Sequence, residues 1–235
     1  MTDVSQGPGG PSDAGGPSGT SGPSAPSQGP GDQRPSGQGR KSQTSTSSGS
    51  AHPDRDRTGG FTALGERAVH AWRSFRLVEA EFEAPGGERF SRTFLRHPGA
   101  AGIVAIDGDE AVLVRQYRPV MGREVLEIPA GTLDRPGEAP AACAVRELAE
   151  EAGARAAHWE HLATYGVAVG ISDEQLHLYL ATELTFGERE ADGIEEQTMT
   201  VERLALADVP AAIADGRLAD SKTIIGLLMA RDRLG

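Results

Sequence analysis

Hydrophobic positions are sparse at the start of the chain and become frequent only from about Phe61 onward. From Thr2 to about Thr58 the residues are mostly Gly, Pro, Ser, Gln and Thr. A segment of this composition buries too little apolar surface to offset the entropy lost on ordering. The pattern therefore predicts a disordered tail over residues 1–58, followed by one folded domain over residues 59–235, a normal size for a single domain.

The first part of the predicted domain has the alternating and short apolar runs that are typical of strands. Around Pro-Gly-Gly at 85–87, polar and apolar residues alternate in AWRSFRLVEAEFEAPGGERFSRTFLRH, which predicts two strands joined by a turn. The apolar runs 103–106 and 111–114 flank DGDE, where Asp-Gly favours a tight hairpin. A further strand is predicted at VLEIPAG.

The next stretch, Pro140 to Glu151, predicts a helix. Its proline stands at the first turn, where the missing N–H does no harm, and Gly153 stands just past the end, where a left-handed cap is favoured. Val145, Leu148 and Ala152 share a face that we expect to pack against the sheet.

The remaining segments again mix strands with helices. Strands are predicted at HLATYG, QLHLYLA and MTVERL, and helices near 208–214 and 221–233. The positions expected to face the core are Leu176, Leu178 and Leu180 in one strand, and Ile224, Leu227 and Leu228 in the last helix. Because strands and helices do not alternate strictly, the fold class is α/β or α+β with a mixed sheet.

Composition excludes several classes of function. The net charge of -11 and pI near 5.0 argue against a nucleic-acid partner, which needs a basic face. The single cysteine, Cys143, excludes an intrachain disulfide and fits a reducing compartment, so we expect a cytoplasmic protein and a small buried thiol. The chain shows neither a secretory signal nor an apolar run long enough to span a bilayer.

Glutamates cluster on the predicted helix in an unfavourable way. Glu147, Glu150 and Glu151 share one face at spacings i, i+3 and i+4, where like charges repel by roughly 0.2–0.5 kcal/mol per pair. Glu150 and Glu151 also fall in the last turn, where the helix dipole is negative. A solvated surface is the simple alternative, but two such penalties indicate a bound cation. Oxygen ligands suit Mg²⁺ or Mn²⁺, and the lack of a Cys/His cluster argues against zinc.

The residues around these glutamates resemble the Nudix box. In GTLDRPGEAPAACAVRELAEEAG, seven residues separate Glu138 from the segment Arg146 to Gly153. One departure is that six residues separate Gly131 from Glu138, where the usual box has five. The resemblance implies the Nudix fold, a mixed β-sheet sandwiched between helices, in which the box forms a loop-helix-loop that binds divalent ions against a substrate diphosphate.

The resemblance also implies roles for individual residues. Glu147 and Glu151 match the principal metal carboxylates, and Glu150 a further ligand. The carbonyl of Ala130 matches a backbone metal ligand. Arg146 matches the arginine that pairs with the box carboxylates and orients them.

Strings outside the box are similar to the ADP-ribose diphosphatase branch of this family. They are RQYRP, LEIPAG, GISDEQLHLYLA and DSKTIIGLL. This likeness implies hydrolysis of ADP-ribose to AMP and ribose 5-phosphate by a homodimer. It also implies a general base on the loop before MTVERL, which by position is Glu195, with Glu196 as the adjacent candidate. Gln197 stands where some relatives have another acidic metal ligand.

Candidate substrate contacts follow from the same likeness and from charge. Arg118 and Arg92 are expected near the substrate phosphates or terminal ribose, because guanidinium groups match phosphate geometry. Thr132 and Glu174 are further expected substrate-binding residues. Val169 stands where the branch commonly has a proline, which weakens a strict assignment to ADP-ribose.

Two alternatives remain open at this point. The box does not distinguish ADP-ribose from another nucleotide sugar, a dinucleotide or an oxidised nucleotide. The chain could instead be a non-catalytic domain that senses ADP-ribose, but that hypothesis predicts eroded box carboxylates and an attached DNA-binding domain, and the sequence shows neither. Trp72 and Phe75 either stack on an adenine or pack within the sheet.

Overall fold

The computed structural model describes residues 58–189 and 198–235. All of these belong to the second of the chain's two units, His52–Gly235. The predicted tail, residues 1–58, therefore lies outside the described residues except for its last position, and so do Glu195, Glu196 and Gln197.

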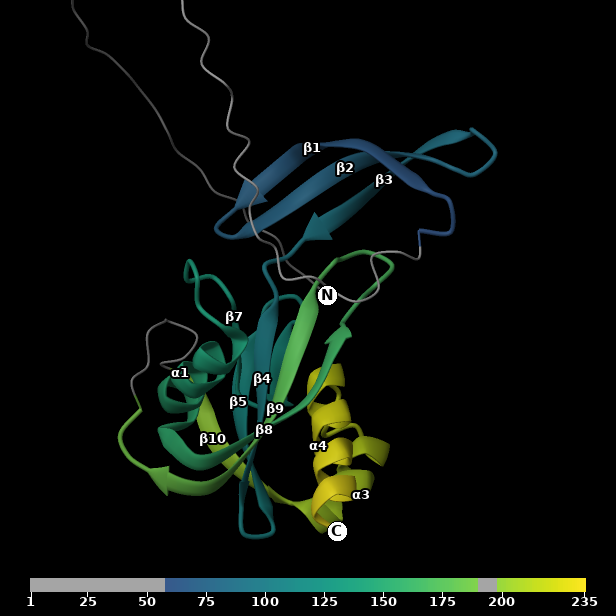
Figure 1. Ribbon diagram of the computed structural model, residues 1–235. Coiled ribbons are helices and arrows are strands. Elements are labelled where there is room, and N and C mark those ends of the chain that lie inside the picture. The colour runs from purple at the N-terminus through teal and green to yellow at the C-terminus, as the bar shows by residue number, and fades with distance from the viewer. Residues whose placement is uncertain (1–57, 190–197) are drawn as a thin grey trace, which may run out of the picture. The chain divides into compact units, whose positions relative to one another are not determined.

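Within the described part of the chain, seven strands form one mixed sheet (Figure 1). The strands are β4 (Ala100–Asp107), β5 (Glu110–Arg118), β6 (Arg123–Glu127), β7 (Ala130–Thr132), β8 (Ala154–Gly166), β9 (Gln175–Phe186) and β10 (Thr200–Ala205). Their order is β10-β5-β4-β9-β8, with β6 paired to β5 and β7 paired to β4. The β4–β9 pair is parallel and the others are antiparallel, so the predicted mixed sheet is confirmed.

Helices cover both faces of this sheet, as the Nudix resemblance implied. Helix α1 (Pro140–Ala152) lies on one face, and α3 (Val209–Ala214) and α4 (Ser221–Leu234) lie on the other (Figure 1). Strand β4 contributes side chains to the hydrophobic cores on both faces of the sheet, because successive side chains of a strand point to opposite faces. Ile103 packs in the cluster with α1, whereas Val104 packs in the cluster with α4.

The predicted strand at VLEIPAG is two strands in the structure. Strand β6 pairs with β5, and β7 pairs with β4. The break falls at Ile128 and Pro129, and proline lacks the N–H that a continuous ladder would need. The change of partner brings residues 130–132 beside α1, where the site is built.

The prediction that Val145 and Leu228 face the core is wrong. Val145 on α1 is 46% exposed and Leu228 on α4 is 43% exposed, whereas their neighbours Leu148 and Leu227 are fully buried. The buried face of α1 also includes Cys143, Ala144, Glu147 and Glu151, so it is turned away from Val145. The buried face of α4 consists of Thr223, Gly226, Leu227 and Ala230, and Leu228 falls outside it.

A second sheet precedes the first along the chain. In the described residues it has three strands, β1 (Thr62–Trp72), β2 (Phe75–Glu83) and β3 (Arg89–Arg96), in the order β1-β2-β3. The β2–β3 hairpin is the predicted one. Strand β1 was not predicted, because all of its residues are exposed and its sequence has no buried alternation.

The ends of the helices agree with the sequence. Proline begins α1, and Gly153 closes it with φ 61°, in the left-handed region.

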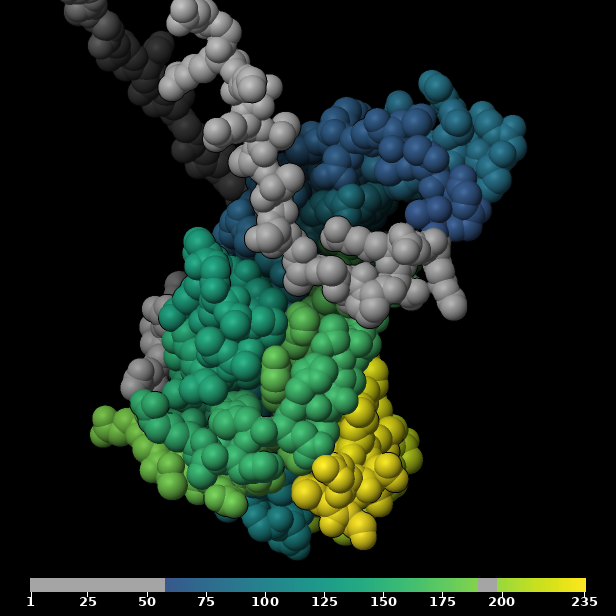
Figure 2. Space-filling model, in the orientation of Figure 1, coloured from purple at the N-terminus to yellow at the C-terminus, as the bar shows by residue number. Residues whose placement is uncertain are grey.

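The yellow helix α4 lies against the green surface of β8, where Arg233 pairs with Glu160 at 2.9 Å (Figure 2). No helix in the described part of the chain is both long and apolar enough to cross a membrane.

Candidate active site

The site is built where α1 passes closest to β7. Gly131 has no side chain there, and a Cβ at this position would come within 1.7 Å of Glu147 Oε1. The carboxylate of Glu147 therefore lies directly against the backbone of β7, and its residue is only 7% exposed. Only glycine permits this approach, which explains the residue at the start of the box string.

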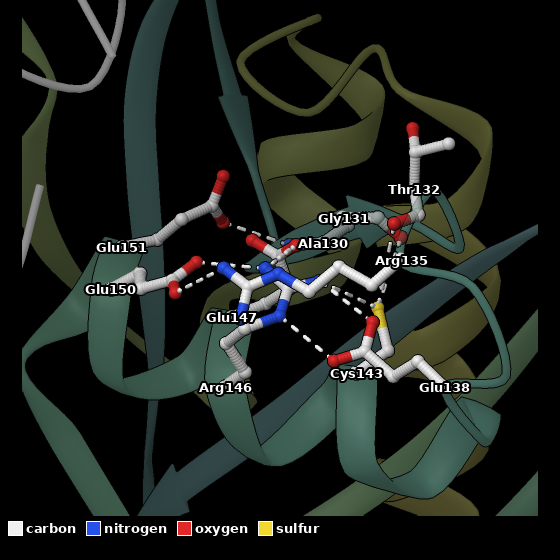
Figure 3. Close-up of polar contacts among 10 residues, drawn as sticks. All are labelled: Ala130, Gly131, Thr132, Arg135, Glu138, Cys143, Arg146, Glu147, Glu150 and Glu151. Carbon is white, nitrogen blue, oxygen red and sulfur yellow. Dashed lines mark hydrogen bonds and ion pairs between the residues drawn. The ribbon is translucent and has the colours of Figure 1, made fainter. Parts of the chain in front are cut away.

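Arg146 connects the carboxylates of the box (Figure 3). Its Nε and Nη2 donate to the two oxygens of Glu138, each at 3.0 Å. Its Nη1 donates to Glu147 Oε1 at 2.6 Å and to Glu150 Oε2 at 2.8 Å. The hydrogen bonds, that to Glu138 foremost, raise the pKa of Arg146, and the same contact lowers the pKa of Glu138. Arg146 thus relieves the repulsion that the glutamate spacing creates.

Glu151 is held from the other side. Its Oε2 accepts a hydrogen bond from the backbone N–H of Ala130 at 2.8 Å, and the residue is 5% exposed (Figure 3). The resemblance assigns the carbonyl of Ala130 to a metal, whereas the contact seen here uses its N–H. The role of the carbonyl stays a prediction.

The chemistry of the side chains near β7 indicates which metal ion they suit. Among the residues that the structure describes, no group of His, Cys, Asp and Glu side chains is gathered as a ready metal site, since Arg146 and Ala130 engage the box carboxylates. The donors that meet at β7 are nevertheless carboxylate oxygens, and the Glu147 carboxylate occupies the space that a Cβ at Gly131 would take. Such hard oxygen donors fit Mg²⁺ or Mn²⁺ and do not favour zinc.

Cys143 lies beside Arg146, whose Nη2 is 3.5 Å from its sulfur. The residue is fully buried in the core on the α1 side. Burial raises the pKa of its thiol to about 12, with the charge of Glu147 adding to the effect. The thiol therefore stays protonated, in agreement with its expected role as small buried filler.

A cavity of about 540 Å³ adjoins the box residues. Of the expected substrate contacts, Arg118, Thr132 and Glu174 line it, together with Ala130. Arg92 does not line this cavity: its guanidinium lies 4.8 Å from the Phe90 ring centroid in the small sheet.

A protein-family comparison matches residues 95–224 of the chain to the NUDIX domain. The chain belongs to the Nudix family. This match spans the box helix, the cavity and all but the end of the α/β sandwich.

The chain is also similar to curated relatives and to a solved structure. The chain is 36% identical to an ADP-ribose pyrophosphatase of Mycobacterium tuberculosis, over 72% of this chain and 82% of that protein. It is 35% identical to a methanol dehydrogenase activator of Bacillus methanolicus, over 68% and 86%. The solved structure, described as an ADP compounds hydrolase, has a TM-score of 0.66 at 26% identity and covers 74% of this chain and 94% of that one.

The Nudix domain also contains a charged group that sequence reasoning missed. Glu127, Asp220 and Lys222 line the cavity beside Arg118. Arg118 donates two hydrogen bonds to Glu127, from Nε to Oε1 at 2.7 Å and from Nη2 to Oε2 at 2.6 Å. Lys222 Nζ contacts the same carboxylate. These residues lie in the strings LEIPAG and DSKTIIGLL, which the sequence analysis singled out. Neither string indicates that the charged residues of one contact those of the other.

The other predicted residues either fall outside the described residues or do not line this cavity. The loop glutamates Glu195 and Glu196 fall outside the described residues. Trp72 is 43% exposed, and its ring stacks on Phe75 with centroids 5.8 Å apart. Val169, at the position of the marker proline, is 85% exposed and does not line the cavity.

Proposed function

We propose that this Nudix domain hydrolyses the diphosphate linkage of ADP-ribose, giving AMP and ribose 5-phosphate in a reaction that requires Mg²⁺ or Mn²⁺. The observation that carries the proposal is a shared segment of backbone. Ala130 and Gly131 line the cavity and at the same time contact the box carboxylates Glu151 and Glu147. A diphosphate bound in the cavity therefore lies next to the groups that bind metal in this proposal.

The relatives support the choice of substrate. The M. tuberculosis relative is named for ADP-ribose, and the solved structure is named for ADP compounds. The cavity volume of about 540 Å³ falls in the range of roughly 300–1,000 Å³ that is usual for small-molecule sites. Arg118 faces this cavity and supplies a guanidinium for the anionic substrate.

In this proposal Glu147, Glu150, Glu151 and the carbonyl of Ala130 hold the metal. A divalent ion offsets the charge of the diphosphate and makes water more acidic at neutral pH. Arg146 keeps the carboxylates oriented before the ion arrives, because it bonds Glu147 and Glu150 through one nitrogen. Their mutual repulsion is then reduced in the metal-free protein.

A carboxylate of the 190–197 segment acts as the general base. We assign this role to Glu195, with Glu196 as the adjacent candidate. Its carboxylate takes the proton from the attacking water as the oxygen bonds to phosphorus, and the other phosphate leaves. The non-catalytic alternative fits less well, because a sensor has no need for Glu147 and Glu151 to be held against β7.

We further propose a cytoplasmic homodimer. Strand β1 supports this, because it is exposed along its whole length and carries exposed apolar residues such as Val69 and Trp72. In the dimer, Trp72 or Arg92 would contact the partner's substrate. Light scattering at micromolar concentration tests the assembly, and a fully active monomer would contradict it.

A substrate panel tests the proposed function. Purified full-length protein is assayed with Mg²⁺ on ADP-ribose, GDP-mannose, diadenosine diphosphate and an oxidised nucleoside triphosphate. We expect the highest kcat/KM for ADP-ribose. A higher value for one of the others would reassign the substrate, and inactivity on all of them would refute the diphosphatase proposal.

A further inference from the structure

Lys222 stands in an unusual place for a cation. It is the second residue of α4, and positive charge is unfavourable at the N-terminus of a helix. Its side chain is 14% exposed, although lysine is among the residues that proteins bury least. The chain also prefers arginine elsewhere: of its 23 basic residues, only Lys41 and Lys222 are lysines. A compact ammonium at this position therefore needs a physical reason.

The reason lies in the carboxylate that faces it. Glu127 is 2% exposed, and Arg118 and Lys222 both contact its oxygens. Burial alone would raise the pKa of Glu127, but the hydrogen bond from Arg118 and the charge of Lys222 together lower it. Lys222 Nζ also contacts Asp220 Oδ2 at 3.0 Å. These four side chains form a charge-balanced group, which we call the Glu127 cluster.

The Glu127 cluster is anchored to the fold on both sides. Asp220 caps α4 by accepting from the backbone N–H of Thr223 at 3.0 Å. The buried hydroxyl of Thr223 donates to Asp220 at 2.6 Å and accepts from the N–H of Ile128 at 2.9 Å. Because Ile128 follows Glu127 directly, the start of α4 is fixed relative to that carboxylate. Lys222 can then hold its contact without searching many rotamers.

Because Glu127 is shared between two cations, it neutralises only part of the positive charge of Arg118. Its Nε and Nη2 are engaged by Glu127, while Nη1 has no hydrogen-bond partner among the described residues. The Arg118 side chain is 41% exposed and lines the cavity. Without Lys222 the cluster would carry a net negative charge, bind Arg118 more strongly and repel an incoming anion.

We propose that Lys222 is a positioning residue for diphosphate recognition: by neutralising Glu127 together with Arg118, it leaves the arginine oriented and electrostatically free to bind the anionic part of the substrate. This inference rests on the cavity being the substrate site of the proposed function. It adds a residue at the far end of the chain to that site and assigns it a role distinct from the metal carboxylates.

The test uses inorganic pyrophosphate as the probe and calorimetry on the full-length, metal-free protein. Lys222→Met is expected to weaken pyrophosphate binding about tenfold or more, because the cluster gains a net negative charge. Lys222→Gln removes the same charge but keeps a polar side chain, and it is expected to weaken pyrophosphate binding similarly and to preserve the fold if the Met variant does not. The double variant Lys222→Met with Glu127→Gln is expected to recover most of the affinity, since charge balance is restored.

Arg217→Met is the matched control. The substitution removes one positive charge near the start of α4, as Lys222→Met does. The Arg217 side chain, however, is 53% exposed, pairs with Asp215 and does not line the cavity. Its affinity for pyrophosphate is expected to stay within about twofold of the wild type, as for a screened surface charge. With ADP-ribose, Lys222→Met is expected to raise KM by a factor similar to its loss of affinity and to change kcat little.

Three results would overturn the inference. They are a Lys222 variant that binds within twofold of the wild type, a double variant as weak as the single one, and a wild type that does not bind pyrophosphate. The second would mean that Lys222 contacts the anion directly and does not act through Glu127. Failure of the proposed function is seen separately, as a wild type that binds pyrophosphate but does not hydrolyse ADP-ribose.

Discussion

Replacing Gly131 by alanine is a sharp perturbation, because one methyl group would enter the space that the Glu147 carboxylate fills. The added Cβ would lie 1.7 Å from Oε1, 1.9 Å from Cδ and 2.4 Å from Cγ of Glu147. Real Cβ contacts essentially never fall below 3.0 Å. A small adjustment of the terminal oxygens cannot relieve contacts that include Cγ, so the whole side chain must leave its position.

The expected cost differs between stability and catalysis. Moving Glu147 breaks its 2.6 Å hydrogen bond with Arg146, and overpacking of this kind costs about 1–3 kcal/mol. That corresponds to a fall in Tm of about 2–4 °C for each kcal/mol in a domain of this size. Activity should suffer more, since misplacing an active-site group by about 1 Å costs roughly 100-fold in rate. We therefore expect a folded protein with kcat reduced by roughly 100-fold or more.

Urea unfolding and Mg²⁺ titrations of kcat with ADP-ribose measure the two effects. Gly86→Ala is the matched control, because Gly86 lies in the turn between β2 and β3 and has nothing within 4 Å of the place that an added methyl group would take. The control should keep both activity and its Mg²⁺ requirement. If Gly131→Ala kept kcat within about threefold of wild type at the same Mg²⁺ requirement, the proposed placement of Glu147 would be refuted.

Four further outcomes are expected. Glu151→Gln should lower kcat by several orders of magnitude with little change in Tm, because a metal charge partner is lost at nearly constant shape; normal kcat at saturating Mg²⁺ would contradict this. Arg146→Lys should lower kcat and raise the Mg²⁺ requirement, since one ammonium cannot replace the guanidinium fork, and an unchanged Mg²⁺ titration would argue against it. Glu195→Gln should depress kcat far more than Glu196→Gln with little effect on KM, and the reverse order would move the base by one residue. Deleting residues 1–57 should leave Tm and kcat nearly unchanged, and a fall of several degrees would show that the segment contributes to the fold.

Local patterns predicted much of the fold. The proline and Gly153 at the ends of α1 mark its limits, and Leu176, Leu178 and Leu180, at alternate positions of β9, are all buried. These signals are local because they follow from the backbone geometry of a few neighbouring residues. Strand β1 lacked such a signal, since a strand that is exposed throughout has no buried face for the sequence to mark.

The box was predictable for the same reason. Arg118, Thr132 and Glu174 were expected from the resemblance and line the cavity, but the contact between Glu127 and Lys222 was not predicted. Glu147, Glu150 and Glu151 share one helix, so spacing alone placed them together. Glu127 and Lys222 are 95 residues apart and meet only through the packing of α4 on the sheet. Charge pairs of that separation leave no periodic trace in a single sequence.

The most direct test of the central claim is product analysis of ADP-ribose hydrolysis by the purified full-length protein, with wild type and Glu151→Gln assayed side by side. With Mg²⁺, the wild type is predicted to release AMP and ribose 5-phosphate in equal amounts, and chelation of the metal or the Glu151 substitution should abolish release. Intact ADP-ribose after prolonged incubation with Mg²⁺, or equal product formation by Glu151→Gln, would contradict the account.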